Sequence, residues 1–96
     1  MNLNGYQFAG PYNVDLPFDN DFGAIYAIID DFSKVLDIGQ TGSINDRVQY
    51  HDRRHCWDRN KSGALHLYVL VNPSEQSRLQ IEQSLRIFYN PMCGVK

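Results

Sequence analysis

The alternation of apolar and polar segments predicts three β-strands in this chain. Residues 24–29 (AIYAII) and 34–39 (KVLDIG) are rich in β-branched residues and flank the polar turn 30–33, a pattern typical of a β-hairpin. Residues 64–71 (ALHLYVLV) are apolar almost throughout, which indicates a strand in the interior of a sheet. These three segments form the expected sheet.

Two helices are predicted from the residues that begin them. Ser43, with Asp46 three residues later, is a capping-box-like start to a helix expected to end near Arg53. Residues 72–75 (NPSE) supply an N-cap, a proline at the first helical position and an acidic first turn. They predict a second helix over residues 73–89.

The remaining segments complete the expected organisation. Residues 1–22 hold many Asn, Gly and Pro residues without a helical period, so we expect an extended arm with one short strand around residues 6–8. Residues 54–63 are polar and turn-rich, with Trp57 as an anchor in the core. The order β-β-α-β-α in residues 23–96 predicts an α+β fold of two layers, with helices packed on a small mixed three-stranded sheet.

Length and composition describe one ordinary globular domain. The 96 residues suffice for a single modest core. No apolar run approaches the length of a membrane span, and the first ten residues lack the basic region and apolar stretch of a secretion signal. We therefore expect a cytoplasmic protein with no membrane partner.

The two cysteines do not form a metal-binding pair in the sequence. Cys56 and Cys93 lie far apart and no CxxC motif exists, so free thiols are expected. A zinc site built from His51, His55, Cys56 and Cys93 is a weaker alternative, because its last ligand would have to come from the C-terminal tail.

The distribution of charge is uneven. A net charge of -2 and a pI near 5.8 argue against a general nucleic-acid coat protein. Residues 47–61 nevertheless hold five cationic residues against two anionic ones, which predicts a basic face on an acidic molecule. Its candidates for nucleic-acid contacts are Arg53, Arg54, Arg59 and Lys61.

Four polar residues suit chemistry on a phosphodiester. In the first predicted helix, Arg47 and His51 are four residues apart, so both point from one face and could hold a phosphate. Glu82 lies beside the apolar stripe of the second helix, at the edge of its buried face. Tyr26 alternates onto one face of the first strand. Taken singly, each of these residues also fits an ordinary core or surface role.

The joint spacing of these residues resembles the GIY-YIG nuclease family over residues 23–94. The two signatures of the family correspond here to residues 24–26 (AIY) and 37–39 (DIG). The family has an arginine eight residues after that glycine, which falls on Arg47, and a histidine or tyrosine four residues further on, which falls on His51. Its metal-binding glutamate, nine residues before a proline, falls on Glu82, with Pro91 as the proline.

The resemblance implies a small endonuclease that hydrolyses phosphodiester bonds with one Mg²⁺ or Mn²⁺ held by Glu82. In that role Tyr26 is a general base or positions water, Arg47 stabilises the phosphate, and His51 assists by hydrogen bonding. DNA is the expected substrate ahead of RNA. Specificity would come from a homodimer or a partner protein, since only the short arm accompanies the domain.

Two positions depart from the family pattern. Asp37 stands where the second signature has a tyrosine, and Gly94 stands where the tail has an asparagine. Asp37 is expected either to serve the site as an extra metal ligand or alternative base, or to mark a site of low activity. The alternative function is a catalytically weak or inactive module of the same fold that binds nucleic acid or a protein.

Overall fold

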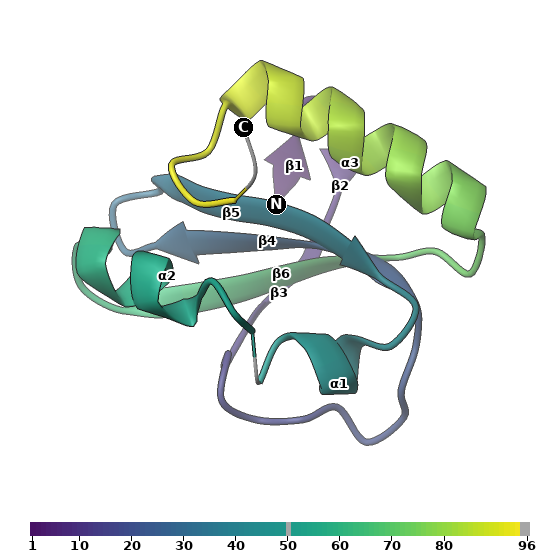
Figure 1. The fold of residues 1–96 in the computed structure, drawn as a ribbon, viewed down its shortest axis with the longest axis horizontal. Coiled ribbons are helices and arrows are strands. Elements are labelled where there is room, and N and C mark those ends of the chain that lie inside the picture. The colour runs from purple at the N-terminus through teal and green to yellow at the C-terminus, as the bar shows by residue number, and fades with distance from the viewer. Residues whose placement is uncertain (50, 95–96) are drawn as a thin grey trace.

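A four-stranded antiparallel sheet forms the centre of the computed structural model, which describes residues 1–49 and 51–94 (Figure 1). Its strands, in spatial order, are β3 (Ala9–Tyr12), β6 (Leu65–Val71), β4 (Ala24–Asp30) and β5 (Val35–Thr41). A separate small hairpin joins β1 (Asn2–Leu3) to β2 (Tyr6–Gln7).

The three strands predicted from the sequence are confirmed as β4, β5 and β6, and β4 and β5 form the expected hairpin. The expected mixed three-stranded sheet is wrong, because the sheet is antiparallel throughout and has a fourth strand. That strand comes from the N-terminal arm: β3 pairs with β6, with Ala9 opposite Val69 and Tyr12 opposite Leu67. The arm thereby covers an edge that would otherwise be open, and β6 lies inside the sheet as predicted.

The helix expected over residues 43–53 is replaced by a shorter one, α1 (Ile44–Arg47). Residue 50 of the expected helix lies outside the described residues. Ser43 caps α1 as predicted, since its hydroxyl oxygen accepts a hydrogen bond from the Asp46 N–H at 3.4 Å. Beyond α1 the chain turns inward and buries His51. Arg47 and His51 therefore do not share one helix face.

A further helix, α2 (Arg54–Asn60), occupies the segment that was expected to form turns. Trp57 explains the difference. Its side chain is fully buried on one side of α2, and its indole N–H donates to an Asp37 carboxylate oxygen at 2.8 Å. Tertiary contacts of this one residue thus outweigh the polar composition of the segment.

The last helix, α3 (Glu75–Tyr89), begins two residues later than predicted. Its N-cap is Ser74, whose hydroxyl oxygen accepts from the Ser77 N–H at 3.2 Å. Asn72, the predicted cap, instead accepts a hydrogen bond from the Ser74 N–H at 2.9 Å. No helix within residues 1–49 and 51–94 is long and apolar enough to cross a membrane.

Helices cover both faces of the sheet, so there are three layers where two were expected (Figure 1). The hairpin β1–β2 and α3 lie over one face, where Ile25, Ala27 and Leu85 are buried together. On the other face, α1 and α2 enclose Tyr26 and Ile28. Because successive residues of β4 point to opposite faces and both faces are covered, every residue of β4 is buried.

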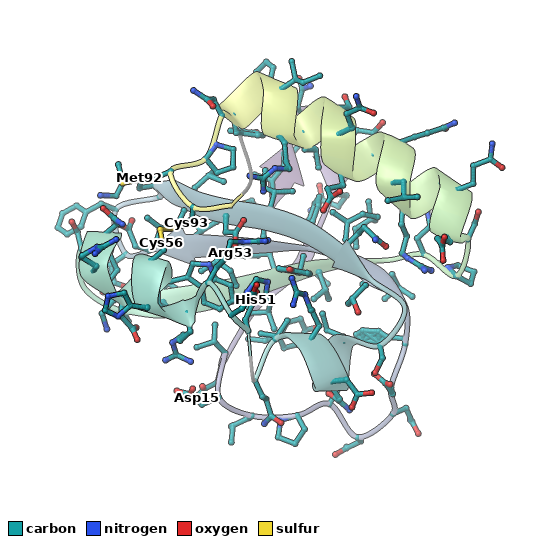
Figure 2. All side chains as sticks on the ribbon, viewed as in Figure 1. Asp15, His51, Arg53, Cys56, Met92 and Cys93 are labelled. Carbon is teal, nitrogen blue, oxygen red and sulfur yellow. A yellow bond between two sulfur atoms is a disulfide. The ribbon has the colours of Figure 1, made fainter. Side chains whose placement is uncertain are left out.

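The two cysteines form a disulfide that ties α2 to the C-terminal tail (Figure 2). The expectation of free thiols for Cys56 and Cys93 is therefore wrong, and the zinc alternative is excluded because both sulfurs are bonded to each other. Although 37 residues separate the cysteines, the tail returns across β5, where the Cys93 N–H donates to the Leu36 carbonyl oxygen at 2.9 Å. Sequence distance gave no sign of this proximity.

Candidate active site

Tyr26 and Gly39 form the centre of the candidate site. They lie opposite each other on β4 and β5. A Cβ atom at Gly39 would stand 2.2 Å from the Tyr26 hydroxyl oxygen and 2.3 Å from Cζ of the ring. The tyrosine ring therefore lies across the strand at the one position without a side chain, which is why a glycine is required there.

His51 packs against this tyrosine. Its Nε2 hydrogen-bonds to the Tyr26 hydroxyl, and its ring lies between the rings of Tyr26 and Trp57, with centroid distances of 5.5 and 4.6 Å. Nδ1 accepts from the backbone N–H of Arg53 at 3.0 Å. When Nδ1 accepts, Nε2 carries the ring proton, so His51 donates to the phenol oxygen.

Burial keeps both rings neutral near pH 7. Tyr26 is 1% exposed, and burial raises its pKa to about 12, against the opposing charges of Arg53 and Arg47. Burial, together with the same two arginines, lowers the pKa of His51 to about 4. The 3.1 Å distance from His51 Nδ1 to Asp52 is then no ion pair. Tyr26 can therefore orient a water or phosphate oxygen as a phenol, but the neighbouring cations do not make it a base.

Arg47 borders this pair from the end of α1. Its guanidinium forms an ion pair with Asp52 at 3.3 Å, and both side chains are well exposed. The charge of Arg47 also acts on Tyr26 and His51, as their pKa shifts show. Arg47 thus lies beside the two rings even though the helix predicted to align it with His51 does not form.

Asp37 is the anchor of a buried network and is not open to a metal ion. Its side chain has no exposure. One carboxylate oxygen accepts from Arg53 Nε at 2.7 Å and from the Trp57 indole at 2.8 Å, and the other accepts from Arg86 Nη1 at 3.0 Å. Donors from Arg53, which precedes α2, from Trp57 in α2 and from Arg86 in α3 thus engage both oxygens. The expected roles of extra metal ligand or alternative base have no support in this geometry, because Asp37 compensates two arginines.

Glu82 stands on the other side of this network. It projects from α3, which covers the face opposite Tyr26, but lies half-buried at the β5 edge of the sheet. Burial raises its pKa, and the charges of Arg86 and Arg53 and the Gln40 N–H oppose that rise. The charge of Arg53 therefore acts on the pKa of both Tyr26 and Glu82. Through this charge Arg53 links the part of the candidate site around Tyr26 to the part around Glu82.

A single carboxylate at an open position fits a hydrated Mg²⁺ or Mn²⁺. Glu82 lines a hollow of about 610 Å³ together with Arg86 and Asn90. The walls of this hollow come from α3 and the residues directly after it, and neither Tyr26 nor Arg53 is among them. Mg²⁺ keeps most of its waters and binds through one or two carboxylates, so Glu82 alone would hold it. The described residues contain no group of three or more His, Cys, Asp or Glu side chains that could enclose a metal ion.

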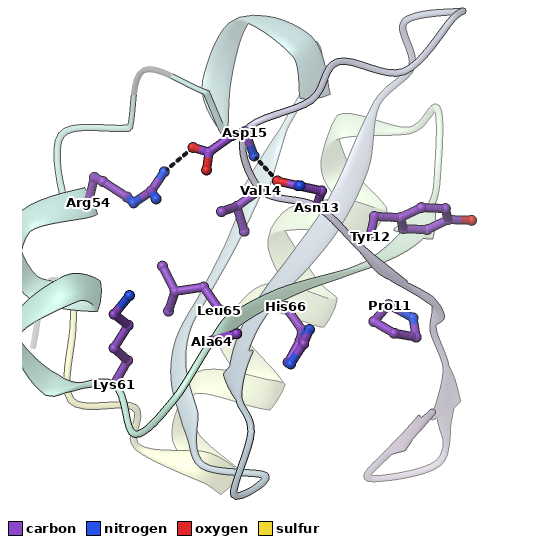
Figure 3. A pocket seen from close by; sticks show the side chains of 10 residues that line it. All are labelled: Pro11, Tyr12, Asn13, Val14, Asp15, Arg54, Lys61, Ala64, Leu65 and His66. Atoms are coloured by element: carbon purple, nitrogen blue, oxygen red, sulfur yellow. Dashed lines mark hydrogen bonds and ion pairs between the residues drawn. The ribbon is translucent and has the colours of Figure 1, made fainter.

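The predicted basic face is largely neutralised by acidic neighbours. Arg54 pairs with Asp15 at 2.7 Å and with Asp58 at 3.3 Å, and Lys61 lies 4.0 Å from Asp58. Arg54 and Lys61 lie on one side of a pocket (Figure 3). The pocket has a volume of about 460 Å³, and neither Tyr26 nor His51 is among its lining residues. Arg59 is exposed on α2.

Sequence reasoning missed the contribution of two residues. Arg86 holds Asp37 from α3, and Arg53 is an inner residue of the site, whereas the sequence placed it on the basic face. One signal was available: an aspartate inside an apolar strand requires a cationic partner when it is buried. The sequence alone did not say which arginine would supply it.

No protein-family model matches the chain, and no curated protein or solved structure does so.

Proposed function

We propose that the protein is a metal-dependent endonuclease of the GIY-YIG type, which hydrolyses phosphodiester bonds of DNA ahead of RNA. One observation carries the proposal. The tyrosine and glycine of the two signatures are in contact, and the histidine expected from the spacing donates to that tyrosine. Ordinary core packing has no need of a tyrosine, a histidine and a glycine in this arrangement within reach of two arginine charges, Arg47 and Arg53.

The proposed roles follow from protonation and position. Tyr26, as a phenol, orients the attacking water or a phosphate oxygen, and His51 fixes the direction of the phenol oxygen. Arg47 contributes positive charge from the exposed side. Glu82 would hold Mg²⁺ or Mn²⁺, which when bound stabilises the negative charge that develops on the leaving oxygen.

A second function is favoured by one specific observation. Tyr26 and His51 are only 1% and 5% exposed, so a substrate has no direct access to them unless the protein rearranges. A catalytically weak or inactive module that binds nucleic acid or a protein, alone or as a homodimer, needs no such movement.

A plasmid-nicking assay with Mg²⁺, Mn²⁺ or EDTA distinguishes the two functions. The unmodified protein should nick DNA only with metal, and Glu82→Gln should abolish nicking. Glu75→Gln is the matched control, because Glu75 is the exposed glutamate of the same helix. Mg²⁺ should also raise the melting temperature of the unmodified protein but not that of Glu82→Gln.

The outcomes separate cleanly. Absence of Glu82-dependent cutting of DNA and RNA with either metal overturns the nuclease proposal. Salt-dependent binding of DNA without cutting supports the binding module.

We also propose a cytoplasmic location, as the sequence suggested. The Cys56–Cys93 disulfide weighs against this location, because reducing compartments normally disfavour such bonds, so the state of the two cysteines in the cell has to be measured. Thiol alkylation of the protein in rapidly quenched cells should show Cys56 and Cys93 protected. Alkylated cysteines would mean that the bond forms only outside that compartment.

A further inference from the structure

Arg53 is held in one orientation from both ends. Its backbone N–H donates to His51 Nδ1 at 3.0 Å, and its side-chain Nε donates to Asp37 at 2.7 Å. The acceptor of the second bond is fully buried and is itself held by Trp57 and Arg86. Little side-chain freedom therefore remains for Arg53 to lose when it binds a ligand.

The outer edge of this guanidinium faces solvent. The Arg53 side chain is 21% exposed. Within the described residues, Nη1 and Nη2 have no hydrogen-bond acceptor, and no buried side-chain nitrogen lacks a partner. These two nitrogens are therefore open to water, and they form the parallel pair of donors that binds a phosphate in bidentate fashion.

Arg53 is also close enough to the other candidate residues for its charge to act on them. Its charge acts on Tyr26, His51 and Glu82, the residues on both sides of the candidate site. Burial works against the charge of Arg53, yet its bond to Asp37 leaves its pKa above the ordinary value. Arg53 is therefore a permanent cation whose charge acts on both the Tyr26 phenol and the candidate metal ligand, Glu82.

The other two arginines of the site are less suited to this task. Arg47 pairs with the exposed Asp52 in a contact that salt screens readily, so this contact does not hold its guanidinium in one orientation. Arg86 uses Nη1 on Asp37 and on the Ile38 carbonyl, and Nη2 on the Cys93 carbonyl at 3.2 Å. Its fork is directed into the protein.

We infer that Arg53 is the principal phosphate-binding residue of this site, and that Asp37 is its positioning residue. The ligand is a phosphate oxyanion, which the proposed function identifies as that of a phosphodiester. Asp37, at the position where the second signature has tyrosine, thus supports anion binding by fixing the arginine fork.

Inorganic phosphate, titrated into the unmodified protein and followed by NMR of the arginine Nε–H groups, tests the inference without any cleavage. The Arg53 signal should move in a saturable way, while that of Arg59, which is exposed on α2, should not. If the chemical shift of the Arg53 Nε–H group does not change while other groups of the protein reach saturation with phosphate, the inference is overturned. The measurement uses the unmodified protein, so it does not depend on a variant that might fail to fold.

Two variants then separate fork geometry from charge. Arg53→Gln should weaken phosphate binding about tenfold or more, while Arg59→Gln should change it less than about twofold. Arg53→Lys keeps the charge but loses the fork and the Nε bond, so it should bind nearly as poorly as Arg53→Gln. Full binding by Arg53→Lys would overturn the positioning role of Asp37.

Failure of the proposed function is recognisable separately. If phosphate binds at Arg53 but the protein shows no Glu82-dependent cutting, the anion site stands and the nuclease proposal fails. If DNA is cut equally well by Arg53→Gln, the nuclease proposal stands and the assignment of Arg53 fails.

Discussion

The ring of Tyr26 occupies the space that a side chain at Gly39 would need, with the hydroxyl oxygen 2.2 Å from the position of a Cβ atom. Gly39 is not in the left-handed region, so the requirement for glycine is one of close approach, not of backbone conformation. The glycine of one signature and the tyrosine of the other are therefore coupled by packing. This contact also directs the tyrosine hydroxyl toward His51.

Gly39→Ala should consequently displace Tyr26 and lower the free energy of unfolding by about 1–3 kcal/mol through overpacking. Gly42→Ala is the control, because a Cβ there would meet only Arg78 at an ordinary 3.5 Å. Urea denaturation measures both. Equal stability of the two variants would contradict the tight contact at Gly39.

Asp37→Asn should be strongly destabilising, because it removes the one negative charge between Arg53 and Arg86 in a buried site. A loss of about 3–5 kcal/mol is expected from breaking a buried ionic network. Asp37→Tyr, which introduces the family's residue, should be at least as harmful, since a phenol cannot compensate two guanidinium groups.

Trp57→Phe is a milder change to the same network and is compared with Asp37→Asn. It removes one hydrogen bond to the carboxylate and leaves both arginines paired, so a smaller loss of about 1–2 kcal/mol is expected. A small effect of Asp37→Asn, comparable with that of Trp57→Phe, would mean that the ion pairs contribute little.

Stability should fall as the pH is lowered from about 6.5 toward 4, because of His51. Its pKa is about 4 in the folded protein and near 6.5 in the unfolded chain, so the unfolded chain binds the extra proton in this window. The stabilisation is present above pH 6.5 and is lost below it. Between pH 7 and pH 5 the free energy of unfolding should drop by about 2 kcal/mol from this group.

His51→Gln should remove that part of the pH dependence, as measured by urea denaturation at both pH values. His55→Gln is the control, because His55 is exposed on α2. An identical slope in the unmodified protein and in His51→Gln would show that His51 does not resist protonation in the folded state.

Reduction of the Cys56–Cys93 bond should lower the free energy of unfolding. The bond closes a loop with a sequence separation of 37 residues, for which chain entropy predicts about 4 kcal/mol. The measurement is urea denaturation with and without a dithiol reductant. The variant with both cysteines changed to alanine should match the reduced protein and should not respond to the reductant.

Local patterns in the sequence were sufficient for the elements whose causes are local. The three apolar runs became β4, β5 and β6, Ser43 caps its helix, and Trp57 is a core anchor. Hydrophobic periodicity and capping depend on neighbours a few residues away, so they can be recognised in the sequence without knowledge of the tertiary structure. The spacing of Tyr26, His51 and Gly39 was likewise readable, and these three residues do meet.

Only the tertiary structure decided what depends on contacts between distant segments. It brought β3 to the edge of β6, joined Cys56 to Cys93 and split the expected helix so that His51 could be buried. It also decided the role of Asp37, since a carboxylate serves as a ligand, a base or a structural anchor according to its burial and partners. Arg53 precedes α2 and Arg86 lies in α3, 16 and 49 residues away from Asp37, and no local rule links such positions.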